Sequence, residues 1–135
     1  MKIEITDQMT LSEIQNEFHE LFPFLKIEFY SKPHQTHEPS SKSSMLKPST
    51  LVKDCRTIHN DGNIFIHGGL TVERLEHIFQ ECYGLSVQVF RKSGSVWIET
   101  TVTDDWTLNK QNEEAESFFK ASDELNESER NILGN

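Results

Sequence analysis

The sequence predicts an α+β protein with a ferredoxin-like β-α-β-β-α-β order, extended by a fifth strand and a C-terminal helix. The main observation is a tandem repeat, in which residues 3–22 align with residues 64–83 and, after one deletion, residues 25–32 align with residues 85–92. Each copy also runs from a strand pattern through a helix pattern to a second strand pattern. Right-handed crossovers fold two such units most simply into one sheet with both helices on one face. The identical pairs of the first segment are Ile3 with Ile64, Ile5 with Ile66, Thr10 with Thr71, Phe18 with Phe79 and Glu20 with Glu81.

The first repeat unit, residues 1–32, opens with Ile3-Glu4-Ile5, an alternation typical of a strand with one buried face. Thr10 and Glu13 have the capping-box spacing of a helix start. Pro23 ends that helix, because the residue before a proline is pushed away from helical dihedral angles. Alternating apolar residues then indicate a second strand over residues 25–30. The apolar stripe of the helix comprises Leu11, Ile14, Phe18, Leu21 and Phe22.

The connection, residues 33–61, interrupts this pattern with prolines at 33, 39 and 48 and a serine-rich run at 40–44. A structureless segment of that length is unusual in a compact domain. We therefore expect a short helix after Pro48, where Leu51, Val52, Cys55 and Ile58 share a face.

The second repeat unit, residues 62–92, predicts a strand at 63–67, a helix at 71–83 and a strand at 85–92. Gly84 follows the helix, where a C-terminal glycine is common. Lys92-Ser93-Gly94-Ser95 indicates a tight hairpin into a fifth strand over residues 96–102. The residues expected to face inward from the helix are Val72, Leu75, Phe79 and Cys82.

The C-terminal part predicts a third helix from Asp104 onward, because its acidic start suits the positive end of a helix dipole. Residues 113–135 hold many acids and few apolar side chains, which predicts an acidic helix or tail that is partly disordered. We expect residues 1–112 to form a single domain.

Composition narrows the classes of function. The chain has 135 residues, 35% of them hydrophobic, which is enough for one core. Its net charge of −9 disfavours nucleic acid and anionic membrane surfaces as partners. The N-terminus shows no apolar signal core, and the two cysteines are too few for a disulfide framework. A cytoplasmic location with reduced thiols is therefore the expectation.

Four residues of the connection are candidate zinc ligands, namely His34, His37, Cys55 and His59. They lack the paired knuckles of a structural zinc site and the His-Glu-x-x-His helix of a metalloprotease, so a solvated loop with one buried thiol explains them better.

Cysteine and histidine could also form a nucleophile and base, as Cys55 with His59 or Cys82 with His77. No orienting group or oxyanion donor accompanies either pair, and Cys82 falls on an apolar stripe. Asp104 and Asp105 are explained by the start of a helix. The sequence therefore favours a protein without catalytic residues, resident metal or cofactor.

Three aromatic residues, Tyr30, Phe90 and Trp97, are expected on the sheet face that the helices leave open. RNA-recognition domains stack bases on such a face, but beside basic residues and a strand motif that this chain lacks. Burial against another protein is one explanation. The other is that the third helix, led by Trp106 and by Phe118 or Phe119, folds back across the face.

The segments 89–101, 103–108 and 111–112, together with 22–26 and 56–62, resemble a family of small bacterial proteins with no assigned activity. The resemblance spans nearly all of residues 1–112. It implies a free-standing bacterial cytoplasmic protein and carries over no catalytic or binding residue.

The leading functional hypothesis is a non-enzymatic domain that acts by association with itself or another protein. The contact would use the open sheet face or the edge of the fifth strand. The alternative is a small-molecule or metal-binding protein, which could be an enzyme, that uses the connection from His34 to His59. Nucleic-acid binding ranks behind both because of the charge.

Overall fold

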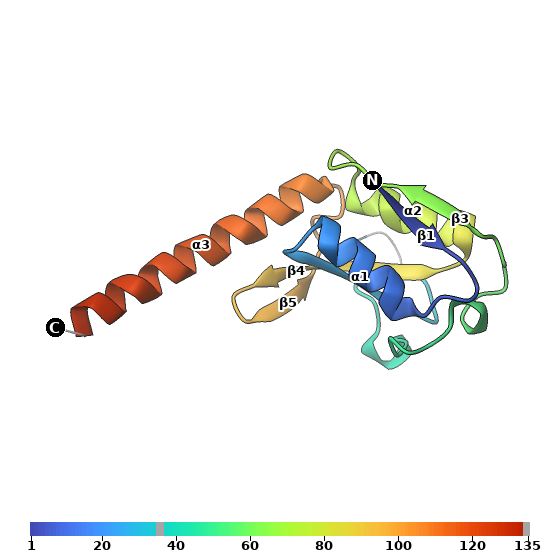
Figure 1. Cartoon of the computed structure of the whole chain (residues 1–135), viewed down its shortest axis with the longest axis horizontal. Coiled ribbons are helices and arrows are strands. Elements are labelled where there is room, and N and C mark those ends of the chain that lie inside the picture. Colours follow the sequence, from blue (N-terminus) through green and yellow to red (C-terminus); the bar gives the residue numbers. More distant parts are fainter. Residues whose placement is uncertain (35–36, 134–135) are drawn as a thin grey trace.

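The structure is a computed structural model that describes residues 1–34 and 37–133, with the backbone alone for residues 124–133. Figure 1 shows a body of strands and helices from which one long helix projects. No helix in this described part is long and apolar enough to cross a membrane. In chain order the elements are β1 Lys2–Ile5, α1 Leu11–Leu21, β2 Leu25–Tyr30, the 3-10 helices η1 Lys42–Ser44 and η2 Val52–Asp54, β3 Gly62–Phe65, α2 Val72–Tyr83, β4 Ser86–Ser93, β5 Val96–Glu99 and α3 Leu108–Leu133.

The two repeat units pair with each other, strand by strand. β1 runs antiparallel to β3, and Ile3 lies opposite Ile64, its own counterpart in the sequence repeat. β2 runs antiparallel to β4, and Glu28 lies opposite Gln88, again its counterpart. Equivalent residues pair in this way only where an approximate two-fold axis passes between them. The sequence repeat thus has a structural counterpart in the strand register.

The structure does not have the predicted ferredoxin-like strand order. β1 and β3 form a two-stranded sheet, whereas β2, β4 and β5 form a three-stranded sheet in that order. A short hairpin would bring β2 and β3 together, but residues 31–61 separate them. Because no tight turn constrains these two strands, each pairs with its repeat counterpart instead. The α+β class is confirmed, and β5 lies beside β4 as expected.

The two shorter helices start in the same way. The hydroxyl of Thr10 accepts the backbone N–H of Glu13, and the hydroxyl of Thr71 accepts that of Arg74. Gly84, with φ of 64°, ends α2 in the left-handed conformation. The buried stripe of α2 includes Glu76 and ends at Tyr83, so Cys82 is exposed rather than inward-facing. The buried residues of α2 are Val72, Leu75, Glu76, Phe79 and Tyr83.

Both sheets and the helices share one hydrophobic core. Phe18 of α1 and Phe79 of α2 occupy equivalent repeat positions, and both are fully buried. The Phe79 ring meets the Phe29 ring edge-on at a centroid distance of 5.9 Å. The largest fully buried side chains are Phe18, Phe29, Phe79, Ile3, Ile5, Leu11, Ile14, Leu25, Ile27, Leu75, Leu85 and Leu108.

The structural repeat extends beyond the segments that the sequence shows. The N–H of Leu11 donates to the carbonyl of Thr50 at 2.9 Å, and in the second copy the N–H of Val72 donates to the carbonyl of Trp106 at 3.0 Å. In each copy, the segment that carries this carbonyl leads directly into a helix. That helix is the three-residue η2 in the first copy and the 26-residue α3 in the second. The corresponding segments are residues 48–52 and 104–108.

The connection runs along the edge of β2. The N–H of Leu46 donates to the carbonyl of Phe29 at 2.8 Å, and Met45 forms an isolated bridge with Tyr30. In the second copy, the N–H of Thr100 donates to the carbonyl of Val89 at 3.1 Å. The connection therefore flanks β2 as the end of the β5 segment flanks β4.

The third helix begins at Leu108 rather than near Asp104, because the hydroxyl of Thr107 accepts the N–H of Lys110 at 3.1 Å and caps the helix there. Its first turns pack on the body, and the rest projects away from both sheets (Figure 1). The expected disorder of the tail concerns residues up to 135, and residues 134–135 lie outside the described part.

Replacing Phe18 or Phe79 by alanine should lower the free energy of unfolding by roughly 3–5 kcal/mol, because each change empties a fully buried site. Urea denaturation measures the loss. Phe65→Ala is the matched control, since Phe65 is 73% exposed. A near-neutral effect at either buried position would contradict the prediction that the repeat places both rings in the core.

Candidate functional site

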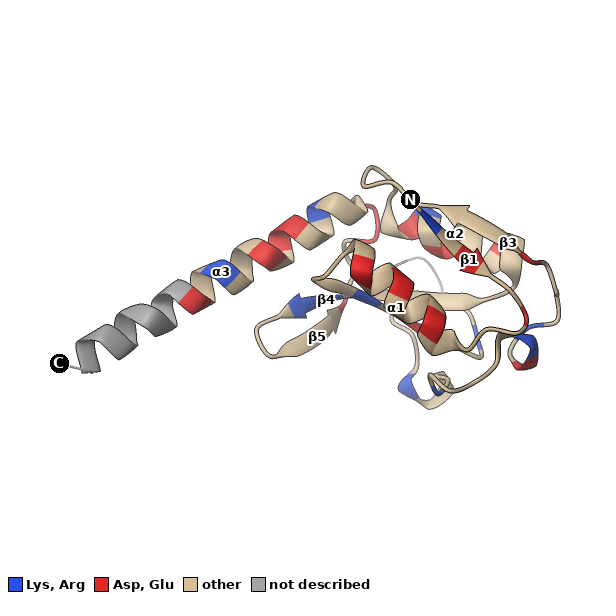
Figure 2. Cartoon of the chain, viewed as in Figure 1, with Lys and Arg blue, Asp and Glu red and all other residues tan. Residues whose placement is uncertain are grey.

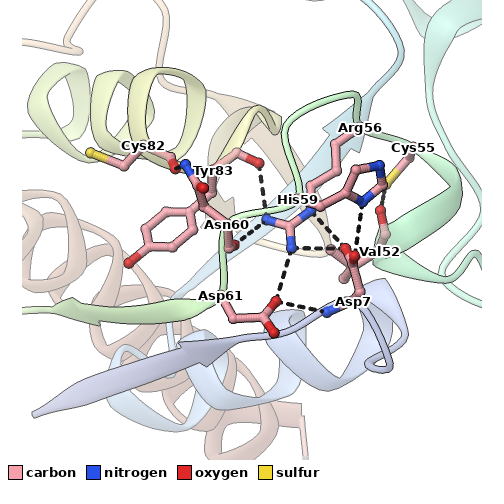
Figure 3. A network of polar contacts seen from close by, with 9 residues as sticks. All are labelled: Asp7, Val52, Cys55, Arg56, His59, Asn60, Asp61, Cys82 and Tyr83. Carbon is pink, nitrogen blue, oxygen red and sulfur yellow. Dashed lines mark hydrogen bonds and ion pairs between the residues drawn. The ribbon is translucent and has the colours of Figure 1, made fainter.

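A polar network surrounds Arg56, whose side chain is fully buried (Figure 3). Nε and Nη2 of Arg56 donate to Oδ1 of Asp7 at 3.0 and 2.8 Å, and Nη2 also donates to Oδ1 of Asp61 at 3.2 Å. Nη1 donates to the backbone carbonyls of Asn60 and Tyr83 at 2.7 and 3.2 Å. The network ties the loop after β1 to the connection and to the end of α2.

The geometry of the Arg56 network indicates a structural role rather than a ligand-binding role. A guanidinium has five N–H donors, and the five hydrogen bonds of Arg56 use all of them, so none is left for a ligand. His59 donates from Nδ1 to Oδ2 of Asp7 at 2.8 Å. The thiol of Cys55 donates to the carbonyl of Val52, and burial raises its pKa, which disfavours the nucleophilic thiolate. Cys55 and His59 thus bond to other groups rather than to each other.

A second polar region lies between α2, the start of the connection and the loop before α3. Glu76 of α2 is 9% exposed, and its Oε2 accepts the backbone N–H of Val89 at 3.0 Å. Its Oε1 lies 3.4 Å from Nε2 of His34. Burial raises the pKa of the Glu76 carboxyl, while the hydrogen bond and charge of His34 oppose that shift.

Asp104 forms the second carboxylate of this region and is 1% exposed. Its Oδ2 accepts the backbone N–H of His37 at 3.2 Å. Nδ1 of His37 lies 2.8 Å from Oδ1 of Asp104, but it donates to the carbonyl of Thr101, so this buried Oδ1 accepts no hydrogen bond. The bond to Thr101 and the charge of Asp104 raise the pKa of His37.

The four candidate zinc ligands therefore divide between two places. His34 and His37 lie beside Glu76 and Asp104, whereas Cys55 and His59 belong to the Arg56 network. In the described part of the chain, no three His, Cys, Asp or Glu side chains are grouped so that they could hold a metal ion.

The three aromatic residues of the expected open face differ in exposure. Tyr30 is 3% exposed and Phe90 is 9% exposed. Trp97 is half-buried and lies under the ammonium groups of Lys26 and Lys92, which are 5.2 and 5.3 Å from its ring centroid. The connection flanks Tyr30, so neither a partner nor α3 is needed to account for its burial.

Of the nine large apolar side chains that are exposed in the described residues, four lie on β5 and on the middle of α3. We call Val96, Ile98, Phe118 and Phe119 the β5–α3 surface; they are 56%, 37%, 52% and 44% exposed. A Cβ on Gly94, in the turn before β5, would stand 3.9 Å from the Phe118 ring, so helix and hairpin lie side by side.

The sequence pattern singled out neither Asp7 nor Glu76, and it did not show that Arg56 would form ion pairs at the centre of a network. The repeat holds a usable signal, because Glu76 aligns with Gln15 and interrupts an apolar stripe. Asp7 carried no signal, since it follows a strand as many surface acids do.

Comparison of the chain with family models, with curated proteins and with solved structures finds no match. The resemblance to a family of small bacterial proteins remains a prediction.

Replacing Arg56 by methionine should lower the free energy of unfolding by about 3 kcal/mol, because it removes the guanidinium donors from the carboxylates of Asp7 and Asp61 and from two backbone carbonyls. Urea denaturation measures the loss. Lys53→Met, on the exposed side of η2, is the control for removing a charge. Equal stability of the two variants would show that the network does not hold the connection.

The Asp7 carboxylate should also make stability depend on pH. Desolvation alone would raise its pKa, but the hydrogen bonds and charges of Arg56 and His59 lower it below 3.8. The ionised form therefore stabilises the fold above that pH, and the stabilisation is lost as the pH falls through the folded-state pKa. Asp7→Asn should be destabilising at neutral pH, and its difference from wild type should shrink in acid. A difference that stays constant across a pH series of unfolding curves would contradict this.

Proposed function

We propose that the chain is a non-enzymatic association domain that pairs with a second copy of itself through the β5–α3 surface. The observation that carries the proposal is the clustering of exposed apolar side chains where the edge of a sheet meets a projecting helix. Large apolar patches on a protein surface mark contacts with other molecules more often than scattered residues do.

The edge of the three-stranded sheet supports this proposal. β5 pairs with β4 along one edge, and its other edge is the end of the sheet. An exposed edge strand is a template for a strand of another chain. Two β5 strands can pair antiparallel about a two-fold axis, which would join the two three-stranded sheets into one.

The projecting helix supports a partner that lies beyond the body. α3 spans Leu108–Leu133, and 26 helical residues extend about 39 Å. Leu108 and Ala115 bury their side chains against the body, whereas Phe118 and Phe119 lie further along and are about half exposed. Phe119 still touches the Phe24 ring at a centroid distance of 5.7 Å. The helix therefore begins as part of the core and continues as a surface that a partner could cover.

Charge favours a second copy over an unrelated partner. Figure 2 shows acidic residues along α3 and basic residues on the sheet beside it. The described acids of the helix include Glu113, Glu114 and Glu116, and the hairpin carries Lys92. In a two-fold pair the same surface must match itself. Here the acidic helix of each copy can face the basic hairpin of the other.

Replacing Phe118 by alanine should weaken self-association by about 2 kcal/mol or more, because the binding energy of an interface concentrates in a few buried aromatic residues. The same change should leave the melting temperature nearly unchanged, since the ring is 52% exposed in the single chain. Sedimentation over a concentration series, paired with melting curves, measures both effects.

Two controls bracket the Phe118→Ala result. Phe65→Ala removes an exposed ring from β3, away from the proposed contact, and should leave association intact. Trp97→Ala removes a ring held by Lys26 and Lys92 and should lower the melting temperature without dissociating the pair. A wild-type chain that stays monomeric at the highest concentration would reject self-association.

A further inference from the structure

One histidine of the connection binds the loop between β5 and α3. The backbone N–H of His37 donates to Oδ2 of Asp104 at 3.2 Å, and the ring nitrogen Nδ1 donates to the carbonyl of Thr101 at 3.1 Å. The same Nδ1 lies 2.8 Å from Oδ1 of Asp104. We call these contacts the His37 clamp. None of its residues belongs to the β5–α3 surface, so its role does not rest on the proposed association.

The clamp joins a buried carboxylate to an accessible imidazole. Asp104 is 1% exposed, whereas the side chain of His37 is 55% exposed. Nδ1 of His37 carries a proton, because it faces two oxygens that accept hydrogen bonds. The proton that titrates is therefore the one on Nε2, and its loss leaves the hydrogen bond to Thr101 in place. What its loss removes is the positive charge beside the buried carboxylate.

The groups that face His37 favour its charged form. The hydrogen bond to the Thr101 carbonyl and then the charge of Asp104 raise the pKa of His37, and desolvation opposes them. Asp105, from the same loop, and Glu73, from α2, act in the same direction as Asp104. Three acids on two elements thus surround one imidazole.

The other charged groups beside the clamp belong to α2 and to the connection. Arg74 of α2 shares the wall of a pocket with Asp104 and stays charged wherever an imidazole titrates. Glu76 of α2 lies 3.4 Å from His34, whose imidazole therefore meets a different carboxylate. His37 is thus the group in contact with Asp104 whose charge changes near neutral pH.

The backbone of His37 opposes the closed state. Its φ of 61° lies in the left-handed region, and no other non-glycine residue of the described chain has a positive φ. A residue with a Cβ adopts this conformation at a cost and keeps it where its surroundings fix it. Here the fixing contacts are those with Asp104 and Thr101. Loss of the imidazolium charge therefore shifts the balance toward release.

The first repeat shows that the fold of the loop does not require the Asp104 carboxylate. Asp104 corresponds to Pro48, and the carbonyl of each accepts an N–H from the neighbouring helix, that of Glu73 and that of Ser12 respectively. The backbone thus makes the contact that both copies share. The buried carboxylate is additional to it and meets His37 with both oxygens.

The residues after His37 cover part of the three-stranded sheet. Oγ of Ser40 donates to Oε1 of Gln88 at 3.2 Å, and the backbone of Ser40 is hydrogen-bonded to Glu99 of β5. Gln88 is fully buried although its side chain is polar. Because Ser40 stands three residues from the clamp, release of His37 would loosen the cover over Gln88.

We propose that the His37 clamp is a pH-sensitive switch, which holds the connection over the three-stranded sheet while the imidazole is charged and releases it as the imidazole loses its proton. In the released state His37 is solvated and has an ordinary pKa near 6.5. The pKa of His37 is higher in the closed state. Closure is therefore fully favoured below about pH 6.5 and is lost as the pH rises through the folded-state pKa.

Two NMR measurements on the full chain test the switch. The ring protons of His37 report its titration, and solvent exchange of its backbone amide, corrected for the intrinsic effect of pH, reports release. The ring should titrate above about pH 6.5, and the protection of the amide should be lost over the same pH range. The amide of Leu46 is the internal control, because it donates to the Phe29 carbonyl in the same connection and should keep its corrected protection.

Asp104→Asn is the first variant, because its amide oxygen can still accept the N–H of His37 while the charge is gone. It should shift the His37 titration to lower pH and remove the pH dependence of the protection. If Asp104→Asn melts early, His37→Gln tests the same point at a half-exposed position, since its side chain can donate to Thr101 without a charge. The amide of residue 37 should then show no pH-dependent protection. His67→Gln, at an exposed histidine after β3, is the matched control and should behave as the wild type.

Three results would each overturn the proposal: a His37 ring that titrates at or below its ordinary value, a titration that Asp104→Asn leaves unchanged, or a corrected protection that stays constant through the titration. Parallel loss of protection at Leu46 would also overturn it, because the whole chain would then be opening. Sedimentation at each pH records the association state separately, so failure of the switch and failure of self-association are distinguishable.

Discussion

The structure depends on the pairing of each strand with its own repeat counterpart. Ile3 lies opposite Ile64 and Glu28 lies opposite Gln88, so the two copies close around one approximate two-fold axis. This pairing places Phe18 and Phe79 in a common core, in which α1 packs against β2 and α2 packs against β4. A buried face fixes strand register, because a shift by one residue would turn its apolar side chains outward. The helices, the connection and α3 are arranged around that constraint.

Local patterns in the sequence predicted the elements well and their partners poorly. Threonine caps, the Gly84 helix end and the alternating strands are short-range signals, and the structure has all of them. Strand pairing is a long-range property, and the tandem order alone did not reveal that β2 would pair with β4 rather than β3. The burial of Tyr30 could not be foreseen either, because it depends on where the connection passes.

The candidate sites show the same limit. The histidines of the connection were visible as candidates, but their partners Asp104 and Glu76 lie far away in the chain. Cys55 and His59 are close in sequence, yet each contacts another group, because Arg56 and Asp7 organise that loop. Spacing in the sequence identified residue types, whereas the fold decided which charges meet. Comparison of one copy with the other is the most direct guide to them, since Gln15 and Glu76 occupy one structural position with different charges.

The reciprocal pairing of the copies also shapes how the chain reaches its fold. Strand partners such as Ile3 and Ile64 are far apart in sequence, so little of the sheet can form before both copies are present. During synthesis the first copy would wait with unpaired strand edges until the second leaves the ribosome. A single copy has the same edges, and two identical copies could close on each other in the same way. The fold therefore has the form expected of a two-chain assembly whose halves became joined in one polypeptide, with the connection as the joint.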